Sequence, residues 1–194
     1  EKKAFSVMSA PLCILLHGVT GRMGKKRHLE GSLLALRQEG FEVDLTLAGR
    51  TSAPLEALAQ SVGADFTTDV SGAISSGKYD LFFDASSPLI RPALVGQAID
   101  HSIGVYVEKP ISLRLESVIG LNNAWHSRKT FSAIVQDKLF TSGFKTARLA
   151  LEQSILGEIY DIRCEFGYWV ETGFDGEPIN RPSWNFQKHR GGSL

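Results

Sequence analysis

The sequence has no excess of charge of either sign, since 21 lysines and arginines balance 21 aspartates and glutamates. Proteins that bind nucleic acid or a membrane surface through charge normally carry a basic excess, so neither partner is expected. Long apolar runs are also missing, and none approaches the roughly 18 residues that a membrane-spanning helix needs. The first residues, 1–8, lack the apolar core of a secretion signal. These absences favour a cytoplasmic globular protein.

Cysteine is scarce, with only Cys13 and Cys164 in 194 residues. The two lie far apart in the sequence and inside apolar segments, which predicts reduced thiols in the core and fits the cytoplasm. Two cysteines at this spacing do not form a zinc site, and no metal is expected. The hydrophobic share of 43% and the charged share of 22% are ordinary for a globular protein.

Short apolar runs alternate with amphipathic segments over the first 135 residues. The runs predict strands at 12–16, 43–48, 65–67, 81–83, 104–107 and 131–135. The segments between them predict helices at 22–39, 51–62, 88–98 and 113–127, with Gly40 and Gly63 at two of the ends. Alternating strands and helices with short loops require parallel strands and right-handed crossovers. Residues 1–135 are therefore predicted to form an α/β domain on a doubly wound parallel Rossmann sheet.

The pattern changes after Val135. A helix is predicted at 140–155, and a strand with strictly alternating apolar and polar residues follows at 158–170. One-sided alternation is typical of an antiparallel sheet with one face on a core. Residues 136–194 are thus predicted to begin a second, α+β domain with a mainly antiparallel sheet. Because a long unpaired strand offers an edge to other chains, a homo-oligomer through this sheet is expected.

Glycines punctuate the segment that joins the first predicted strand to the first helix, at Gly18, Gly21 and Gly24. A diphosphate group needs backbone N–H groups at a helix N-terminus, and only glycine lets the backbone approach it closely. The spacing is GxxGxxG rather than the usual GxGxxG. The alternative is a turn whose glycines serve geometry alone. The candidate cofactor-binding residues here are Gly18, Thr20, Gly21, Arg22 and Met23.

The end of the second predicted strand indicates which dinucleotide is bound. NAD-binding domains usually place a carboxylate there for the ribose 2′-hydroxyl, but this chain has Arg50 and Thr51. A guanidinium next to a hydroxyl suits the 2′-phosphate of NADP. The sequence therefore favours NADP over NAD, with both residues as candidate contacts. The alternative is that Arg50 is a solvated loop residue.

Two further strand ends carry candidate residues. Ser86 and Ser87 follow the fourth strand, where they could contact the cofactor or only cap the next helix. Glu108, Lys109 and Pro110 follow the fifth strand and are also candidates for cofactor binding. Lys109 is the candidate catalytic residue, since a lysine beside a nicotinamide can help to move a substrate proton, with Glu108 expected to hold its ammonium group. Spacing alone would equally allow a surface lysine.

The histidines are given structural interpretations. His17 precedes the glycine turn and is expected to be mainly structural. His28, His101 and His126 fall on or beside predicted helices and are expected at the surface.

The glycine turn, the Glu108-Lys109-Pro110 segment and the helix-and-strand entry into a second domain together resemble the Gfo/Idh/MocA family. The resemblance covers nearly all of the chain, and Glu-Lys-Pro in this setting is its most specific element. It implies an NAD(P)-dependent, two-domain oxidoreductase that transfers a hydride between a nicotinamide and a sugar- or polyol-like substrate. It also implies a place for Lys109 at the catalytic centre.

The same resemblance places the family's catalytic histidine after Leu194. The chain is therefore expected to be the N-terminal part of the family pattern, and to bind cofactor better than it turns over substrate. An alternative is a catalytically inactive sensor that keeps the fold and binds nucleotide, because fold alone does not fix function.

Overall fold

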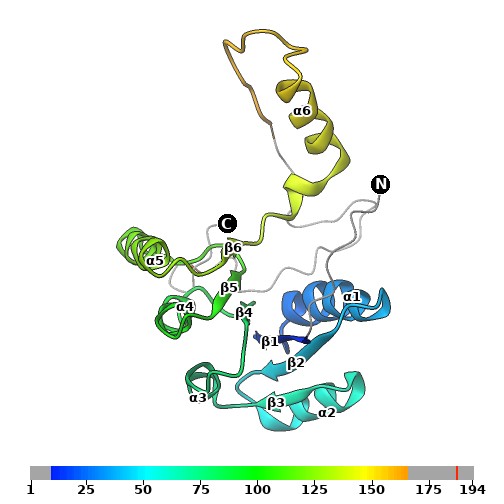
Figure 1. Cartoon of the computed structure of the whole chain (residues 1–194), viewed down its shortest axis with the longest axis vertical. Coiled ribbons are helices and arrows are strands. Elements are labelled where there is room, and N and C mark those ends of the chain that lie inside the picture. Colours follow the sequence, from blue (N-terminus) through cyan, green and yellow to red (C-terminus); the bar gives the residue numbers. More distant parts are fainter. Residues whose placement is uncertain (1–9, 166–186, 188–194) are drawn as a thin grey trace. The chain divides into compact units, whose positions relative to one another are not determined.

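The computed structural model describes residues 10–165 and residue 187 (Figure 1). The chain divides into two compact units, residues 1–135 and residues 136–194. Among the described residues, no helix combines the length and the apolar character needed to cross a membrane.

The first unit is built on a six-stranded parallel sheet in the order β3-β2-β1-β4-β5-β6. Its strands are β1 (Leu12–His17), β2 (Val43–Ala48), β3 (Asp65–Thr67), β4 (Leu81–Asp84), β5 (Gly104–Val107) and β6 (Ser132–Ile134). The predicted doubly wound Rossmann sheet is confirmed. Its order reverses between β1 and β4, so the carboxyl ends of these strands form the switch point at which such sheets bind ligands.

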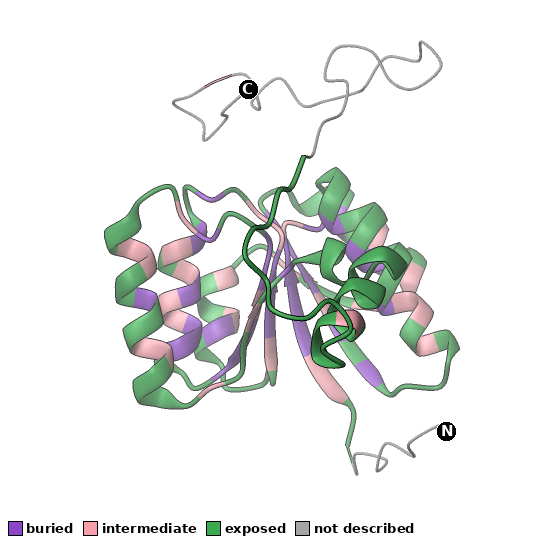
Figure 2. Cartoon of the chain, turned by 90° about the horizontal axis from the view of Figure 1, so that it is seen from above, coloured by how far each residue is buried: buried purple, intermediate pink, exposed green. Residues whose placement is uncertain are grey.

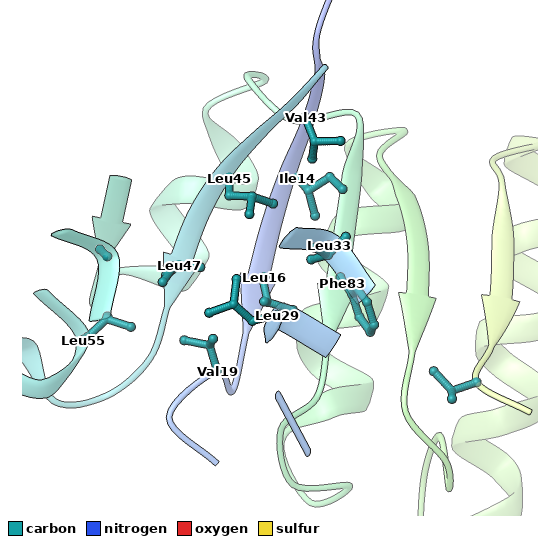
Figure 3. Close-up of a cluster of buried hydrophobic side chains, with 12 residues drawn as sticks. Ile14, Leu16, Val19, Leu29, Leu33, Val43, Leu45, Leu47, Leu55 and Phe83 are labelled. Atoms are coloured by element: carbon teal, nitrogen blue, oxygen red, sulfur yellow. The ribbon is translucent and has the colours of Figure 1, made fainter. Parts of the chain in front are cut away.

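The central strand β1 is buried on both faces, as its unbroken apolar run predicts. Leu16 faces one core cluster with Leu29 and Val19, which lie close together in Figure 3. Leu15 faces the opposite cluster with Phe82 and other residues. The register that pairs Leu16 with Leu47 and with Phe83 places apolar side chains of three strands on the same face.

Helices cover both faces of the sheet, and the strands with buried residues lie between them in Figure 2. The first face is covered by η1 (Met23–Leu33), α1 (Leu34–Gln38) and α2 (Ser52–Val62). The second face is covered by α3 (Val70–Ser75), α4 (Arg91–Asp100) and α5 (Leu115–Arg128). Two hydrophobic layers around one sheet are the usual way in which such a fold buries its core.

The first helix differs from the α-helix predicted at 22–39. Met23–Leu33 is a π-helix, and only Leu34–Gln38 is α-helical. The wider turn shows at its end, where the Leu34 N–H donates to the Leu29 carbonyl five residues back. Leu29, Leu33 and Leu36 recur at spacings of four and three, which predicts one buried face, but Leu36 is 38% exposed. The leucine spacing of four and three fits both kinds of turn over so short a stretch, so the pattern could not separate them.

Two other elements differ from the predictions. The short helix α3 was not predicted, although Asp69 caps it by accepting a hydrogen bond from the Gly72 N–H at 2.8 Å. The helix expected to open at Pro88 begins only at Arg91, because residues 88–90 form a turn first. Its buried residues include Arg91 and Val95, and Leu94 packs against the same core cluster, whereas Ile90 is exposed.

The second unit contains helix α6 (Ser142–Glu152), within the predicted helix at 140–155, and the unpredicted 3₁₀ turn η2 (Asp137–Phe140) before it. Residues 158–165 pair with no other described segment, so they form no strand there. A β-strand needs a neighbouring strand to which it is hydrogen-bonded. The alternation of apolar and polar residues in one segment does not predict whether such a neighbour is present. The rest of that predicted strand, residues 166–170, lies outside the described residues.

Neither cysteine is a core thiol. Cys13 is half-buried and Cys164 is exposed, so the prediction of two buried thiols is wrong. Cys13 is the second residue of β1, and Cys164 follows a run of exposed residues. Burial, together with the nearby Asp80 and Asp44 carboxylates, raises the pKa of the Cys13 thiol.

Candidate functional site

The glycine turn after β1 fits tightly against the segment after β4. Gly18 has a φ of 79°, and a Cβ on it would lie 2.7 Å from both the Ala85 carbonyl carbon and the Ser86 nitrogen. A Cβ on Gly24 would overlap the Gly18 oxygen and lie 2.8 Å from the Val19 Cα. Side chains at either position would push the turn off the sheet, so glycine is required at both.

The turn leaves its outer residues open at the switch point. The Gly21 N–H donates to the Gly18 carbonyl at 3.1 Å, which closes the turn. The predicted residues Thr20, Gly21, Arg22 and Met23 are all exposed, at and just before the first turn of η1. The first turn of a helix leaves backbone N–H groups without partners inside the helix, and these favour an anion.

Arg50 and Thr51 lie on the same edge of the sheet, at the end of β2. The Gly18 N–H donates to the Ala48 carbonyl at 3.1 Å, which joins the glycine turn to this strand end. Both Arg50 and Thr51 are exposed. Thr51 takes the N-cap position of α2, but its side chain makes no capping hydrogen bond. Its hydroxyl and the Arg50 guanidinium therefore remain available to a ligand.

A buried polar network lies beneath the glycine turn. The Asp84 carboxylate, wholly buried at the end of β4, lies 2.7 Å from His17 Nδ1 at the end of β1. Its other oxygen accepts hydrogen bonds from Arg91 Nε at 2.6 Å and from the Ser86 hydroxyl at 3.0 Å. His17, which was expected to be mainly structural, is 4% exposed and serves this network.

The charge of Asp84 is well compensated. Burial alone would raise the pKa of this carboxyl group. The hydrogen bond from His17 and the attraction of His17 and Arg91 outweigh burial, and the pKa of Asp84 is lowered below its ordinary value. The carboxylate therefore stays ionised in the core, where an unpaired charge would be strongly destabilising.

A second buried carboxylate, that of Glu108, follows β5. Glu108 Oε1 lies 2.7 Å from His28 Nε2, and Glu108 Oε2 accepts the Lys109 backbone N–H at 3.1 Å. His28 is 8% exposed, so its predicted place at the surface is wrong, whereas His101 and His126 are exposed as predicted. The His28 ring packs against that of Phe83 in β4, with 4.6 Å between the ring centroids.

Glu108 was expected to hold the Lys109 ammonium group, and this expectation is wrong. The two side chains form no ion pair among those that the described residues make, and the Glu108 oxygens are bound by His28 and by backbone. Burial alone would raise the pKa of Glu108. The hydrogen bond and charge of His28, together with the backbone N–H and charge of Lys109, outweigh burial, so the pKa of Glu108 is lowered. Lys109 is exposed, and its bond to Pro110 is cis.

The serines after β4 play different parts. Ser87 caps the turn before α4, since its hydroxyl accepts the Leu89 N–H at 3.3 Å and its carbonyl accepts the Arg91 N–H at 3.2 Å. Ser86 does not cap and instead donates to Asp84. Of the two, Ser87 is exposed and Ser86 half-buried.

Four residues of the site, His17, His28, Asp84 and Arg91, were not predicted to bind or to position anything. One signal could have identified two of them. Asp84 ends an apolar strand, and Arg91 falls among apolar residues of a helix, where an unpaired charge would be costly. His17 and His28 offered no such signal, because each needs its partner from a distant part of the sequence.

A hollow of about 960 Å³ lies around the first residues of β1, the first half of β2 and the whole of β3. Its lining includes Cys13, Asp44 and Asp65 and none of the predicted site residues. Ligands of doubly wound sheets bind at the carboxyl ends of the strands, so the switch point remains the candidate site.

The strand order and the glycine turn at the switch point define a domain of the Rossmann class. No family model matches the sequence. The chain is 32% identical over 191 residues to a D-xylose dehydrogenase of Paenarthrobacter nicotinovorans, which covers 93% of this chain and 49% of the relative. The chain thus spans about half the length of this curated relative.

Solved structures share the fold. An NAD binding oxidoreductase from Klebsiella pneumoniae matches 95% of this chain and 49% of its own, with a TM-score of 0.73 and 21% identity. The WlbA dehydrogenase from Bordetella pertussis, solved with NADH and UDP-GlcNAcA, matches 80% of this chain and 45% of its own, with a TM-score of 0.68 and 20% identity. These likenesses bear out the resemblance to Gfo/Idh/MocA oxidoreductases that the sequence motifs indicate.

Proposed function

We propose that this protein is an NAD(P)-dependent dehydrogenase or reductase that transfers a hydride between the nicotinamide and a sugar- or polyol-like substrate. The observation that carries the proposal is the exposed segment Thr20–Met23 at the first turn of η1, at the switch point of the sheet. Exposed backbone N–H groups at the start of a helix are what a diphosphate requires there.

Different groups of candidate residues would bind different parts of the cofactor. The exposed turn residues Thr20–Met23 would hold the diphosphate, while Arg50 and Thr51 at the end of β2 would hold the adenosine end. No carboxylate stands at the end of β2 to bind a ribose 2′-hydroxyl, so NADP(H) is favoured over NAD(H). Ser86, Ser87 and the Glu108–Pro110 segment lie at the ends of β4 and β5, on the nicotinamide side.

Lys109 would take part in the chemistry. The cofactor, when bound, supplies or accepts the hydride. Lys109 is exposed at the end of β5, and its ammonium is not bound by Glu108, so it is free to hydrogen-bond a substrate hydroxyl. In that position it would polarise the hydroxyl and help to move its proton.

The relatives support the substrate class. The D-xylose dehydrogenase is named for a sugar, and the WlbA dehydrogenase was crystallised with a nucleotide sugar. These names do not favour an inactive sensor. A cytoplasmic location and a homo-oligomer through a second-domain sheet also remain proposals.

The experiment that tests the proposal is fluorescence titration with NADPH and with NADH. We expect the unsubstituted chain to bind NADPH more tightly than NADH. Arg50→Gln should weaken NADPH binding by about tenfold, which is the value of one lost charged hydrogen bond, and should leave NADH binding almost unchanged.

The matched control is Arg128→Gln, which alters another exposed arginine at the last residue of α5, away from the strand ends that hold the candidate residues. It should bind both nucleotides as the unsubstituted chain does. Absence of binding by the unsubstituted chain would reject the proposed function, and an equal effect of Arg50→Gln on both nucleotides would reject the NADP preference.

A further inference from the structure

Arg91 is a fully buried, large side chain on the first residue of α4, with only 1% of its surface exposed. Its guanidinium group donates three hydrogen bonds. Nε donates to Asp84 Oδ2 at 2.6 Å, Nη2 donates to the Ser86 carbonyl, and Nη1 donates to the Pro110 carbonyl. One side chain therefore binds three separate points of the backbone and core.

The two carbonyls belong to different loops of the candidate site. Ser86 lies in the loop after β4, which also contacts Gly18. Pro110 lies in the loop after β5, directly after Lys109. Apart from strand pairing, the Arg91 guanidinium is a direct link between these loops, and the plane of the group fixes the direction of each bond.

The charge of Arg91 keeps it in this place. Asp84 is wholly buried and ionised, so withdrawing the guanidinium would leave a buried charge with His17 as its remaining ionisable partner. Such a loss is strongly unfavourable. The guanidinium is thus held by Asp84 on one side and can hold the two loops with its remaining N–H groups.

We propose that Arg91 is a positioning residue, which fixes Ser86 and Lys109 relative to one another on the nicotinamide side of the site. The proposal rests on the proposed function for its ligand, and it goes beyond that function by assigning a role to a residue that touches no ligand. A lysine cannot replace Arg91, because its ammonium is a single point with no planar fork to reach both carbonyls and Asp84.

The test compares Arg91→Lys with the unsubstituted chain, using two probes. NADPH spans the whole proposed site, whereas adenosine 2′,5′-bisphosphate occupies only the adenosine end. We expect Arg91→Lys to weaken NADPH binding by about tenfold and the bisphosphate by less than about twofold. An equal loss for both probes, or no loss for NADPH, would overturn the proposal.

The matched control is Arg37→Lys. Arg37 also donates to backbone carbonyls, those of Val43 at 2.8 Å and Val62 at 3.0 Å, but at the start of β2 and so at the opposite end of the strand. This variant should lose stability and keep the ratio of the two binding constants. A change in that ratio would show that any lost guanidinium affects the site, and would overturn the proposal.

A second measurement does not depend on nucleotide binding. In Arg91→Lys, amide hydrogens of residues 85–90 and 108–112 should exchange faster together, while those of β2 should not change. If the unsubstituted chain binds neither probe, the proposed function fails and the exchange data alone decide whether Arg91 fixes the loops. Unchanged exchange in either loop would overturn the proposal.

If Arg91→Lys does not fold, the unsubstituted chain is still informative. Three fixed hydrogen bonds should slow rotation of the guanidinium, so its Nη protons should give separate, slowly exchanging signals in the nuclear magnetic resonance spectrum. A single averaged signal, as a solvated arginine gives, would overturn the proposal.

Discussion

At the scale of single residues, two buried carboxylates connect the first strand-and-helix unit to the rest of the sheet. Asp84 binds His17 of β1, and Glu108 binds His28 of η1. Each carboxylate stands at the end of one of two neighbouring strands. The parts of the chain that carry the glycine turn are therefore held by hydrogen bonds as well as by the apolar core.

Glu108 makes the stability depend on pH. Its folded-state pKa is lowered, mainly by His28 against the effect of burial. Its contribution is therefore fully present above the ordinary carboxyl pKa of about 4.3 and is lost as the pH falls through the folded value. We expect Glu108→Gln to lower the free energy of unfolding by about 1–3 kcal/mol at pH 7, and by less at pH 4.

Urea unfolding at several pH values measures this difference. Glu116→Gln provides the control, since Glu116 is 79% exposed and its pair with Arg114 is long, at 3.9 Å. The control should follow the unsubstituted chain at every pH. A pH-independent deficit in Glu108→Gln would contradict the assignment to the ionised carboxylate.

Gly24 should tolerate no side chain. A Cβ there would overlap the Gly18 oxygen, whereas a Cβ on Gly120 in α5 would meet nothing within 4 Å. We expect Gly24→Ala to cost about 2 kcal/mol or more of stability, because backbone must move, and Gly120→Ala to stabilise by about 0.5–1 kcal/mol. Thermal unfolding of the two variants measures both effects, and equal melting temperatures would refute the tight packing of the turn.

At the scale of elements, the predictions were accurate where the sequence pattern fits only one kind of element. The strands β1 and β2 lay where their apolar runs placed them, with β1 one residue longer, because buried parallel strands leave an unambiguous pattern. The π-helix escaped prediction, since Leu29 and Leu33 satisfy an α-helical spacing equally well. The start of α4 was misplaced because Pro88 suits a turn as well as a helix.

The C-terminus of α5 offers a stabilising substitution. Lys129 ends this helix in the left-handed region, with a φ of 54°, and its N–H donates to the Trp125 carbonyl. A side chain there is strained, whereas glycine is not. We expect Lys129→Gly to raise the free energy of unfolding by about 1 kcal/mol.

Gly63→Ala is the reverse substitution at an equivalent position. Gly63 ends α2 with a φ of 59°, which glycine adopts without strain. It should lower the free energy of unfolding by about 1 kcal/mol. Chemical denaturation of both variants gives the two values. Changes of the same sign would show that the two helix ends are not equivalent in backbone conformation.

At the scale of the whole molecule, the sheet and both of its helical layers lie within residues 1–135. The second unit, in contrast, exposes large apolar side chains on η2 and α6, such as Phe140 at 69% and Phe144 at 52%. We expect residues 1–135 alone to unfold cooperatively and to bind NADPH with a constant within about twofold of the whole chain.

Sedimentation of the two forms separates folding from association. If the apolar surface of the second unit drives self-association, the whole chain should form larger species and residues 1–135 should remain a monomer. A Phe140→Ser and Phe144→Ser double variant of the whole chain should then sediment as a monomer. Unfolded or aggregated residues 1–135 would contradict the expectation that this unit folds independently.

The candidate site was foreseen only as far as local sequence could specify it. The glycine turn, Arg50 and Lys109 could be proposed because each closely follows a strand end, which the apolar pattern reveals, and their roles stay predictions. The pairs His17 with Asp84 and His28 with Glu108 join residues 67 and 80 positions apart. Their closeness depends on the strand order, which propensity and periodicity do not encode.

Hydrogen bonds between neighbouring strands continue for one residue past their ends. The N–H groups of Gly49, Gly18, Ala85, Glu108 and Val135 donate to the last residues of β3, β2, β1, β4 and β5, respectively. The first residue of each of these loops is therefore fixed by the sheet. Only the later residues of the loops can vary without breaking a hydrogen bond of the sheet. During evolution, altered preference for substrate or nucleotide should arise at residues such as Arg50 and Ser87, while these departure points stay fixed.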